Sequence, residues 1–311
     1  MMKGVSALLL RVVALAAVAL FIVSPARSQQ ASQGAPVHLV RINGPIGVGT
    51  EALVSGVLAN AAESSAALVI LELDTPGGLV ASTRKIVKSI LASPVPVAVY
   101  VAPSGARAAS AGTYIAYAAH VVGMAPGTHI GAATPIQMGP PGLPGTRPDK
   151  DGKDDKKDGD GASAAEKKMI NDAIAYLRSL AQLRGRGTEW AEKFVRHAAT
   201  VTASEALAEG IIDISARDTA EFLARLDGRK VTTRAGEKTL AVGGAGIEVI
   251  EPDWKVKFLS AITDPNIAFI LLLIGIYGIF FEFWSPGLTG PGVIGAISLI
   301  LGLYALSALP I

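Results

Sequence analysis

Short apolar runs alternate with amphipathic stretches from Val37 to about Asp213, and this alternation predicts an α/β layer structure built on a parallel sheet. Runs such as residues 68–73 are almost continuously apolar, which is typical of strands buried on both faces. Apolar positions at helical spacing separate these runs. The sequence predicts strands over residues 38–42, 68–73, 95–101 and 121–125, and helices over residues 52–64, 80–92 and 110–119.

The pattern of apolar and polar positions predicts further helices after residue 165. Apolar stripes predict helices over residues 166–183 and 189–196. Thr202 and Glu205 form a capping box that opens a helix over residues 204–209. A short strand is expected at residues 211–214. We therefore expect one α/β domain at residues 37–215, then a small appendage and linker over residues 216–260, with a helix and strand-like pieces at 230–234 and 238–242.

Residues 139–161 interrupt the domain with a different composition. Pro and Gly come first, and then Asp and Lys alternate with hardly an apolar side chain. Such a segment cannot bury enough apolar surface to offset the entropy of the chain. We expect a disordered or mobile surface loop that extends to about residue 165. Because its charges nearly cancel, no metal or polyanion site is expected in it.

Apolar segments at both ends indicate export and a membrane. Residues 1–28 resemble a secretory signal peptide, with basic residues before a short apolar run and small residues before an expected cleavage after Ser28. An uncleaved anchor is the alternative. Residues 267–284 and 293–309 are each long and apolar enough to span a bilayer, so a transmembrane hairpin is expected within residues 265–310. We therefore expect a cell-membrane protein whose α/β domain lies outside the cytoplasm.

The composition excludes several classes of function. The chain contains no cysteine, which rules out disulfides, thiolate metal sites and cysteine nucleophiles. The formal net charge is +2, and Lys and Arg are interspersed with Asp and Glu without forming a basic stripe, so no nucleic-acid partner is expected. No cofactor-binding motif or metal-ligand cluster stands out, and we expect neither a cofactor nor a metal.

Two short segments indicate acyl-transfer chemistry. Residues 74–78 (Asp-Thr-Pro-Gly-Gly) follow a buried strand, so their glycines fall where a strand ends and a helix begins and where backbone N–H groups are unpaired. Residues 108–112 (Ala-Ala-Ser-Ala-Gly) place Ser110 among small residues at the start of a helix, whose dipole favours developing negative charge. The pair predicts an oxyanion hole and a nucleophilic serine.

The residues leave the general base open. Of the four histidines, His38 and His197 lie far from Ser110 along the chain, and His129 remains possible. His120 ends the helix that begins at Ser110, about 15 Å away at 1.5 Å per residue. Among lysines, Lys168 starts a helix next to the expected loop, Lys167 is the alternative beside it, and both could instead be solvated surface residues. A lysine acts as a base only when it is neutral, because the ammonium has no lone pair to accept a proton.

Four separated motifs resemble the membrane-bound NfeD proteases, which belong to the Clp-peptidase class of serine proteases. They are the segments at residues 74–78, 107–116, 124–132 and 171–187, and the resemblance covers residues 37–213 and continues into the transmembrane part. It implies a Clp/crotonase-like fold, in which a layered parallel sheet carries flanking helices. It also implies an assembly, which we expect to be a homodimer or a larger ring.

The resemblance implies a role for each site residue. Ser110 is the nucleophile, and the base is the lysine three residues before the Asn-Asp pair, which is Lys168. Soluble Clp peptidases use a Ser/His/Asp triad, but this chain has Ala133 where they have the histidine, so a Ser/Lys dyad is favoured. The N–H groups of Gly78 and Ala111 would form the oxyanion hole, with Gly77 setting the turn.

The resemblance also implies a substrate, namely hydrophobic segments of membrane-associated proteins such as stomatin-like (SPFH) proteins, with the lipid bilayer as the second partner. Full-length family members usually continue with further spans and a small β-barrel domain, and this sequence stops after two expected spans. Two alternatives keep the fold. A crotonase-like acyl-CoA enzyme uses similar paired N–H groups but needs a CoA ester, and an inactive scaffold would bind the stomatin-like partner without cleaving it.

Overall fold

The computed structural model describes residues 35–136, 164–284 and 289–308. The expected signal peptide and most of the expected loop at residues 139–165 lie outside the described residues.

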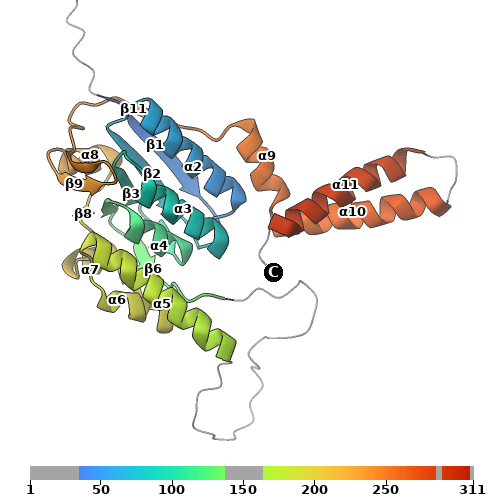
Figure 1. Ribbon diagram of the computed structural model, residues 1–311, viewed down its shortest axis with the longest axis horizontal. Coiled ribbons are helices and arrows are strands. Elements are labelled where there is room, and N and C mark those ends of the chain that lie inside the picture. The colour runs from blue at the N-terminus through green and yellow to red at the C-terminus, as the bar shows by residue number, and fades with distance from the viewer. Residues whose placement is uncertain (1–34, 137–163, 285–288, 309–311) are drawn as a thin grey trace, which may run out of the picture. The chain divides into compact units, whose positions relative to one another are not determined.

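A six-stranded, fully parallel sheet forms the centre of the α/β domain, as the sequence predicts (Figure 1). Its spatial order is β11-β1-β2-β3-β5-β8. The strands are β1 (Val37–Asn43), β2 (Leu68–Asp74), β3 (Val97–Val101), β5 (Val121–Met124), β8 (Ile214–Ser215) and β11 (Ile247–Val249). The residues Thr75 to Gly78 directly follow the carboxyl end of β2, the edge of a parallel sheet where ligands bind in open α/β folds.

Both faces of this sheet are buried, which explains the continuous apolar runs in the sequence. In β3, Val97, Val99 and Val101 pack into one hydrophobic cluster, whereas Ala98 and Tyr100 pack into the other. Figure 1 shows helices α2 (Val48–Glu63) and α3 (Val80–Ala92) in front of the strands. The first cluster also includes residues of α4 (Ala111–Ala118) and α5 (Ala164–Arg184). The layers predicted from the pattern are confirmed.

A second, three-stranded sheet holds the serine segment, and the sequence pattern did not indicate it. It consists of β4 (Arg107–Ala109), β6 (His129–Gly131) and β7 (Thr200–Thr202). Strand β4 is parallel to β6, and β6 is antiparallel to β7. Strands of three residues are too short to show a period in the sequence, so their pairing depends on the tertiary structure.

Helices α6 (Glu189–Arg196) and α7 (Ala203–Ala208) follow α5 along the chain. The capping box of Thr202 and Glu205 is confirmed: the Thr202 Oγ1 accepts from the Glu205 backbone N–H, and the Glu205 carboxylate accepts from the Thr202 N–H at 2.8 Å. The expected strand at residues 211–214 is instead β8 at Ile214–Ser215. Asp213 accepts from the backbone N–H of Val122 at 2.7 Å, and this bond fixes the entry into β8.

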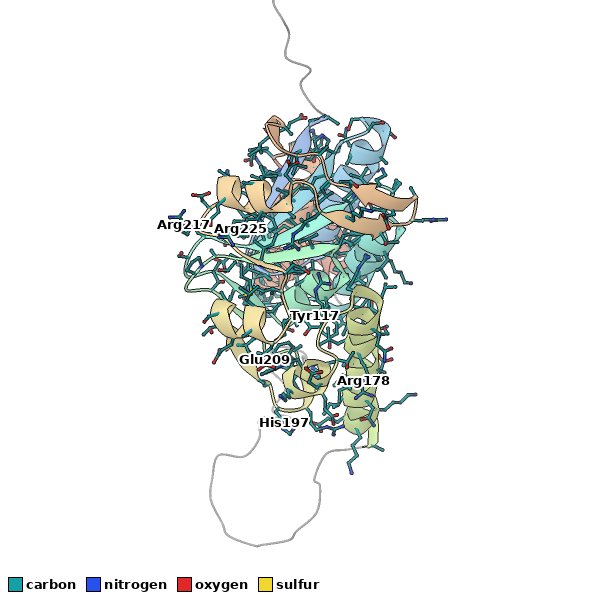
Figure 2. The ribbon with its side chains drawn as sticks, turned by 90° about the vertical axis from the view of Figure 1, so that its left-hand side faces the viewer. Tyr117, Arg178, His197, Glu209, Arg217 and Arg225 are labelled. Carbon is teal, nitrogen blue, oxygen red and sulfur yellow. The ribbon has the colours of Figure 1, made fainter. Side chains whose placement is uncertain are left out.

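The segment after residue 215 packs closely on the sheet. Helix α8 (Thr219–Leu226) places Phe222 in stacked contact with Tyr100, with ring centroids 4.7 Å apart. Arg217 and Arg225 bind Glu221 on the outer surface of this helix, where Figure 2 labels both arginines. After the hairpin of β9 (Lys230–Thr233) and β10 (Gly236–Thr239), strand β11 joins the edge of the main sheet beside β1. Part of the expected appendage thus belongs to the sheet.

The chain then forms α9 (Trp254–Ile262), α10 (Pro265–Trp284) and α11 (Thr289–Ala308). By length and composition, Asn266–Trp284 and Gly290–Ser307 are candidate membrane spans, in agreement with the predicted hairpin. Glycines bring the two helices together: a Cβ on Gly275 would lie 2.8 Å from Leu299, and one on Gly278 would lie 2.6 Å from the Pro291 carbonyl. Small residues at such a contact let transmembrane backbones approach closely.

Candidate active site

Ser110 lies in a sharp turn between strand β4 and helix α4. Its backbone has φ 50° and ψ −112°. This combination is energetically unfavourable for any residue that has a side chain. Strained strand–turn–helix geometry of this kind exposes the nucleophile in α/β-hydrolases. Among the described residues, no hydrogen-bond partner is found for the Ser110 hydroxyl, which is therefore available to a ligand.

Hydrogen bonds from the small sheet hold this strained turn in place. The Ser110 N–H donates to the carbonyl of Gly131 at 3.0 Å. The buried Thr113 hydroxyl lies 2.9 Å from the carbonyl oxygens of both Ala108 and Gly131, so it ties α4 to β4 and β6. Thr113 was not singled out in the sequence, because a lone threonine inside a helix carries no recognisable signal.

The glycine turn after β2 is bonded directly to the strand that carries Ser110. The Thr75 N–H donates to the Arg107 carbonyl at 2.7 Å, and the Ala109 N–H donates to the Thr75 carbonyl at 3.1 Å. The two segments identified in the sequence therefore meet. A Cβ on Gly77 would lie 2.7 Å from the Ser110 Cβ, closer than real Cβ atoms approach, so only glycine fits there.

Gly78 is confined on its other side by Ile46. The Ile46 N–H donates to the Gly77 carbonyl at 2.8 Å, and the Leu79 N–H donates to the Ile46 carbonyl at 2.8 Å. A Cβ on Gly78 would lie 2.1 Å from that carbonyl oxygen. The position therefore requires glycine because of the close approach of another backbone segment.

Two backbone N–H groups beside Ser110 have no acceptor among the described residues. One belongs to Gly78, and the other belongs to Ala111 in the first turn of α4, where helix geometry leaves N–H groups unpaired. The Gly77 N–H is different, because it donates to the Thr75 Oγ1 at 3.1 Å. Gly77 thus shapes the turn, while Gly78 and Ala111 offer donors.

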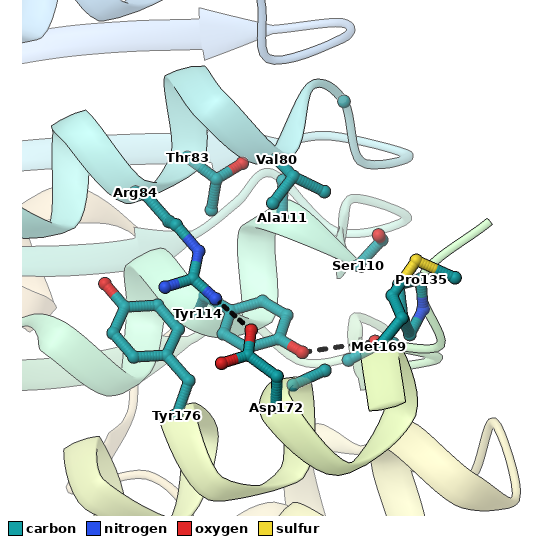
Figure 3. Close-up of a pocket in the computed structure, with 13 residues that line it drawn as sticks. Val80, Thr83, Arg84, Ser110, Ala111, Tyr114, Pro135, Met169, Asp172 and Tyr176 are labelled. Carbon is teal, nitrogen blue, oxygen red and sulfur yellow. Dashed lines mark hydrogen bonds and ion pairs between the residues drawn. The ribbon is translucent and has the colours of Figure 1, made fainter. Parts of the chain in front are cut away.

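Ser110, Gly78 and Ala111 line one pocket of about 240 Å³ (Figure 3). Four residues of α5 at helical spacing form its opposite wall, namely Met169, Asp172, Ala173 and Tyr176. The other lining residues are Val80, Thr83, Arg84, Tyr114, Ala133 and Pro135. Most of these side chains present apolar atoms, so the pocket fits an apolar group next to the serine hydroxyl.

A polar cluster that links α3 to α5 lines part of the pocket. Arg84 binds the Asp172 carboxylate and also lies over the Tyr176 ring, with its guanidinium carbon 4.5 Å from the ring centroid. Tyr114 stacks on Tyr176 at 5.9 Å and donates to the Ala133 carbonyl at 3.3 Å. Burial raises the pKa of both tyrosines, so their phenols stay neutral and can only act as hydrogen-bonding walls.

Lys168 lies on α5 next to Met169, which lines the pocket, but its own side chain is exposed and does not line the pocket as described. Lys168 precedes Asp172 by four residues, or about one helical turn. At 100° per residue, the two side chains therefore leave the helix about 40° apart around its axis. Lys167 is also exposed. The structure thus places Lys168 on the helix that faces Ser110, at the edge of the pocket face.

None of the histidines lines this pocket as described. His38 is buried at the β1–β11 edge, with its Nε2 3.4 Å from the Glu248 carboxylate. His197 is exposed after the end of α6 (Figure 2). His129 lies in β6, opposite Arg107 and Thr202. Ala133 does line the pocket, and its backbone N–H donates to the Phe194 carbonyl at 2.8 Å.

His120 has a structural role, because its Nδ1 accepts the Val97 N–H at 3.0 Å. Burial, followed by the nearby Arg184 charge, lowers the pKa of His120 to about 4. The unfolded chain takes up this proton near pH 6.5, so stability is complete above that pH and is lost as pH falls towards 4. We expect a loss of at most about 3 kcal/mol from this group.

The replacement His120→Asn tests this expectation, since an amide oxygen keeps the acceptor for Val97 without titrating. In unfolding experiments on the detergent-solubilised chain, the wild type should lose more stability than the variant between about pH 7 and pH 4.5. Equal losses in the two proteins would show that His120 is not protonated differently in the folded and unfolded states.

Comparisons with known proteins agree with this fold. Residues 36–141 match the family described as NfeD1b, N-terminal domain, and residues 266–311 match the NfeD integral membrane domain. A solved structure of the 1510-N membrane-bound stomatin-specific protease, a mutant in complex with a substrate peptide, is 36% identical, with a TM-score of 0.62. That likeness covers 74% of this chain and 98% of the other. The chain belongs to the NfeD family.

Two curated relatives of this NfeD protein match over most of its length. The membrane-bound protease PH1510 of Pyrococcus horikoshii is 37% identical over 269 residues, which is 86% of this chain and 57% of that protein. The membrane protein NfeD1b of Bacillus subtilis is 28% identical over 268 residues, 86% of this chain and 55% of its own length. This NfeD chain therefore spans just over half the length of these relatives.

Two further structures of 1510-N have the same fold as this NfeD chain. One is of a mutant with a serine replaced by alanine, with 34% identity and a TM-score of 0.60 over 70% of this chain and 99% of the other. The second, described as a membrane protease specific for a stomatin homolog from Pyrococcus horikoshii, has 34% identity and a TM-score of 0.59 over 74% of this chain and 99% of the other.

Several pocket residues of this NfeD protein were not identified as site residues from the sequence. Met169 and Ala173 belong to an apolar stripe that also fits a core helix. Asp172 shares their face of α5, and a carboxylate within such a stripe is the signal that could have marked this face as functional. Its partner Arg84 lies 88 positions earlier, a pairing that only the fold reveals.

Proposed function

We propose that this protein is a membrane-anchored serine endopeptidase that cleaves hydrophobic segments of membrane-associated proteins, such as stomatin-like (SPFH) proteins. One observation carries the proposal: the available Ser110 hydroxyl and the N–H groups of Gly78 and Ala111, unpaired among the described residues, line the same apolar pocket. These groups supply the nucleophile of an acyl-enzyme and the donors that stabilise the oxyanion of its tetrahedral intermediate.

In the proposed reaction, the Ser110 Oγ attacks the carbonyl carbon of the scissile peptide bond. A neutral Lys168 amine takes the hydroxyl proton and then delivers it to the nitrogen of the departing chain. The Gly78 and Ala111 N–H groups donate to the carbonyl oxygen while it carries negative charge, and the positive end of the α4 dipole adds to this stabilisation. The same amine then takes a proton from water, the resulting hydroxide attacks the ester carbonyl, and the ammonium returns the proton to the departing Ser110 Oγ.

The choice of Lys168 as base rests on two observations. Lys168 lies on α5, whose pocket face is opposite Ser110, and the described part of the pocket contains no histidine. The 1510-N structure with a bound substrate peptide is that of a mutant in which a lysine is replaced by alanine. The long, flexible side chain of Lys168 must turn from solvent towards the serine, which substrate binding would favour by excluding water from the pocket.

The proposed substrate class follows from the pocket walls. Val80, Met169 and Ala173 surround the space beside Ser110 with apolar atoms. Arg84 and Asp172 bind each other, so the two charges beside this space offset each other. A substrate with an apolar residue at the scissile bond gains burial there, whereas a charged residue would lose its hydration without a partner.

The proposed chemistry takes place beside a membrane. The candidate spans α10 and α11 anchor the chain, and we propose that the α/β domain lies on the extracytoplasmic side because of the signal-like residues 1–28. The stomatin-like partner is proposed from the names of the 1510-N structures. A homodimer or larger assembly remains a prediction that the single chain does not test.

The direct test is cleavage by the purified, detergent-solubilised chain of two peptides that differ only at the residue before the expected scissile bond. We expect the peptide with leucine there to be cleaved and the peptide with aspartate to be cleaved at least about 100-fold more slowly, because of the cost of burying an unpaired charge. Equal cleavage of both peptides would refute the assigned pocket, and cleavage of neither would favour the scaffold alternative.

Met169→Ala tests whether this pocket binds the apolar residue. Loss of the thioether side chain should lower kcat/KM for the leucine peptide about 10-fold, within the usual range for a lost apolar contact. Leu183→Ala is the matched control, because Leu183 is on the same helix, 61% exposed and outside the pocket. An equal effect of the two substitutions would show that Met169 does not contact the substrate.

Gly78→Ala tests the oxyanion turn. The new Cβ would meet the Ile46 carbonyl at 2.1 Å, so the turn must shift and the donor must move. We expect kcat to fall about 100- to 1,000-fold, the usual effect of losing one oxyanion donor. Gly56→Ala is the control, since a Cβ at this position of helix α2 would have nothing within 4 Å, and it should keep full activity. Unchanged activity of Gly78→Ala would contradict the assignment.

A further inference from the structure

Helix α9 exposes large aromatic side chains immediately before the first candidate membrane span. Trp254 is 72% exposed and Phe258 is 50% exposed. The start of the helix is well defined, because the Asp253 carboxylate accepts the Val256 N–H at 2.8 Å. Two large aromatic residues four positions apart on a helix lie on the same face. They form an apolar surface that is largely exposed to solvent.

The charges of α9 are arranged around this aromatic face. At 100° per residue, Trp254, Phe258 and Ala261 fall within an arc of about 60°. Lys255 and Lys257 lie on opposite sides of that arc, and the Lys255 Nζ is 6.0 Å from the centroid of the Trp254 ring. An apolar centre with a lysine on each flank matches the cross-section of a helix lying at a lipid–water interface.

Another side of α9 is fixed to the folded domain. A Cβ on Gly49 of helix α2 would lie 1.8 Å from the Ser260 Oγ, so the two helices are in close contact at this point. The face that carries Trp254 and Phe258 is therefore directed away from α2.

The chain enters the candidate span directly after α9. Ile262 ends the helix, and the span begins at Asn266, so at most about 14 Å of extended chain separates them. A Trp residue and lysines next to a span are characteristic of the membrane–water interface, where the ring lies at the level of the headgroups and the ammonium groups reach the phosphates. This continuity identifies a lipid surface as the occupant of the aromatic face.

We propose that α9 is an interfacial helix that lies in the headgroup layer of the bilayer, on the side where α10 begins. Trp254 and Phe258 insert among the upper acyl chains, and Lys255 and Lys257 bind lipid phosphates. Through its contact with α2, the helix holds the α/β domain close to the membrane surface. This role is independent of the catalytic chemistry, so it stands or fails by a separate experiment.

The test uses tryptophan fluorescence of the full chain in lipid nanodiscs. The sequence contains three tryptophans, so replacing Trp190 and Trp284 by phenylalanine leaves Trp254 as the only tryptophan. Phosphatidylcholine brominated near the top of its acyl chains should remove most of the Trp254 emission, and aqueous iodide should have little effect. The control keeps only Trp190 of α6, which bromolipid should leave unquenched.

Two results would overturn the proposal. Strong quenching by iodide without quenching by bromolipid would place Trp254 in water. Protection from both quenchers would show that protein covers the face, for example a second copy of the chain.

A second measurement keeps the proposal testable if the tryptophan variants fail to fold. Because the chain has no cysteine, Phe258→Cys can carry a single spin label, with Leu183→Cys on α5 as the control. Oxygen, which concentrates in lipid, should relax the label at position 258 more than a water-soluble nickel chelate, and the order should be reversed at position 183. Greater relaxation by nickel at position 258 would overturn the proposal.

Discussion

Replacing Ser110 by alanine is expected to reduce peptide cleavage by on the order of 10⁶-fold, as for loss of the nucleophile in other serine proteases. The substitution removes only the hydroxyl, for which no partner is found among the described residues, and leaves the Cβ and the strained backbone unchanged. Stability should therefore change by less than about 0.5 kcal/mol. Rates of cleavage by wild type and variant, with their unfolding midpoints as the control for folding, measure both effects.

A variant that keeps more than about 1% of the wild-type rate would exclude Ser110 as the nucleophile, because residual catalysis from binding alone is far smaller. Ser110→Cys provides a second check. A thiol can form the same acyl intermediate and is much more reactive towards alkylating reagents, and the native chain has no other cysteine to interfere. Alkylation of this variant should block whatever cleavage it retains.

Replacing Lys168 by alanine should lower kcat by about 100- to 10,000-fold, the usual contribution of a general base. Lys168→Arg should be equally inactive, since a guanidinium stays protonated and cannot accept the serine proton. This comparison separates a base from a residue that only supplies positive charge.

Lys167→Ala is the matched control for this pair, since Lys167 is the neighbouring lysine in the first turns of α5 and is also exposed. It should keep nearly full activity. If Lys167→Ala were inactive and Lys168→Ala active, the base would be the other lysine. If both variants were active, another group would accept the serine proton. His129 in β6 is the histidine that the sequence left as a candidate.

The architecture was largely predictable because buried parallel strands have a distinctive composition. Strand β3 is buried at every position, and its apolar run in the sequence could be recognised without any structure. Helix α3 occupies Val80–Ala92, as its apolar spacing predicted. The three-residue strands β4, β6 and β7 could not be predicted in this way, since their stability comes from neighbours distant in the sequence.

The candidate site was also predictable only where its residues reflect local requirements. The two glycines and the small residues around Ser110 were visible because each reflects a local steric requirement, such as the 2.7 Å approach of a Gly77 Cβ to the Ser110 side chain. The wall of the pocket opposite Ser110 could not be predicted from the sequence. Asp172 meets Arg84 only because α5 packs beside α3 and α4, and no local pattern encodes that pairing. The orientation of Lys168 depends on the same packing.

During turnover a substrate acyl group should be attached to Ser110, and detection of that ester is the decisive measurement of the proposed chemistry. The full chain in detergent would be mixed with a hydrophobic peptide thioester, quenched in acid within the first turnover, digested and analysed by mass spectrometry. We expect the acyl group on the peptide that contains Ser110, with no adduct in Ser110→Ala. Turnover of the thioester with no adduct on that peptide, or with the adduct on another residue, would contradict a Ser110 nucleophile.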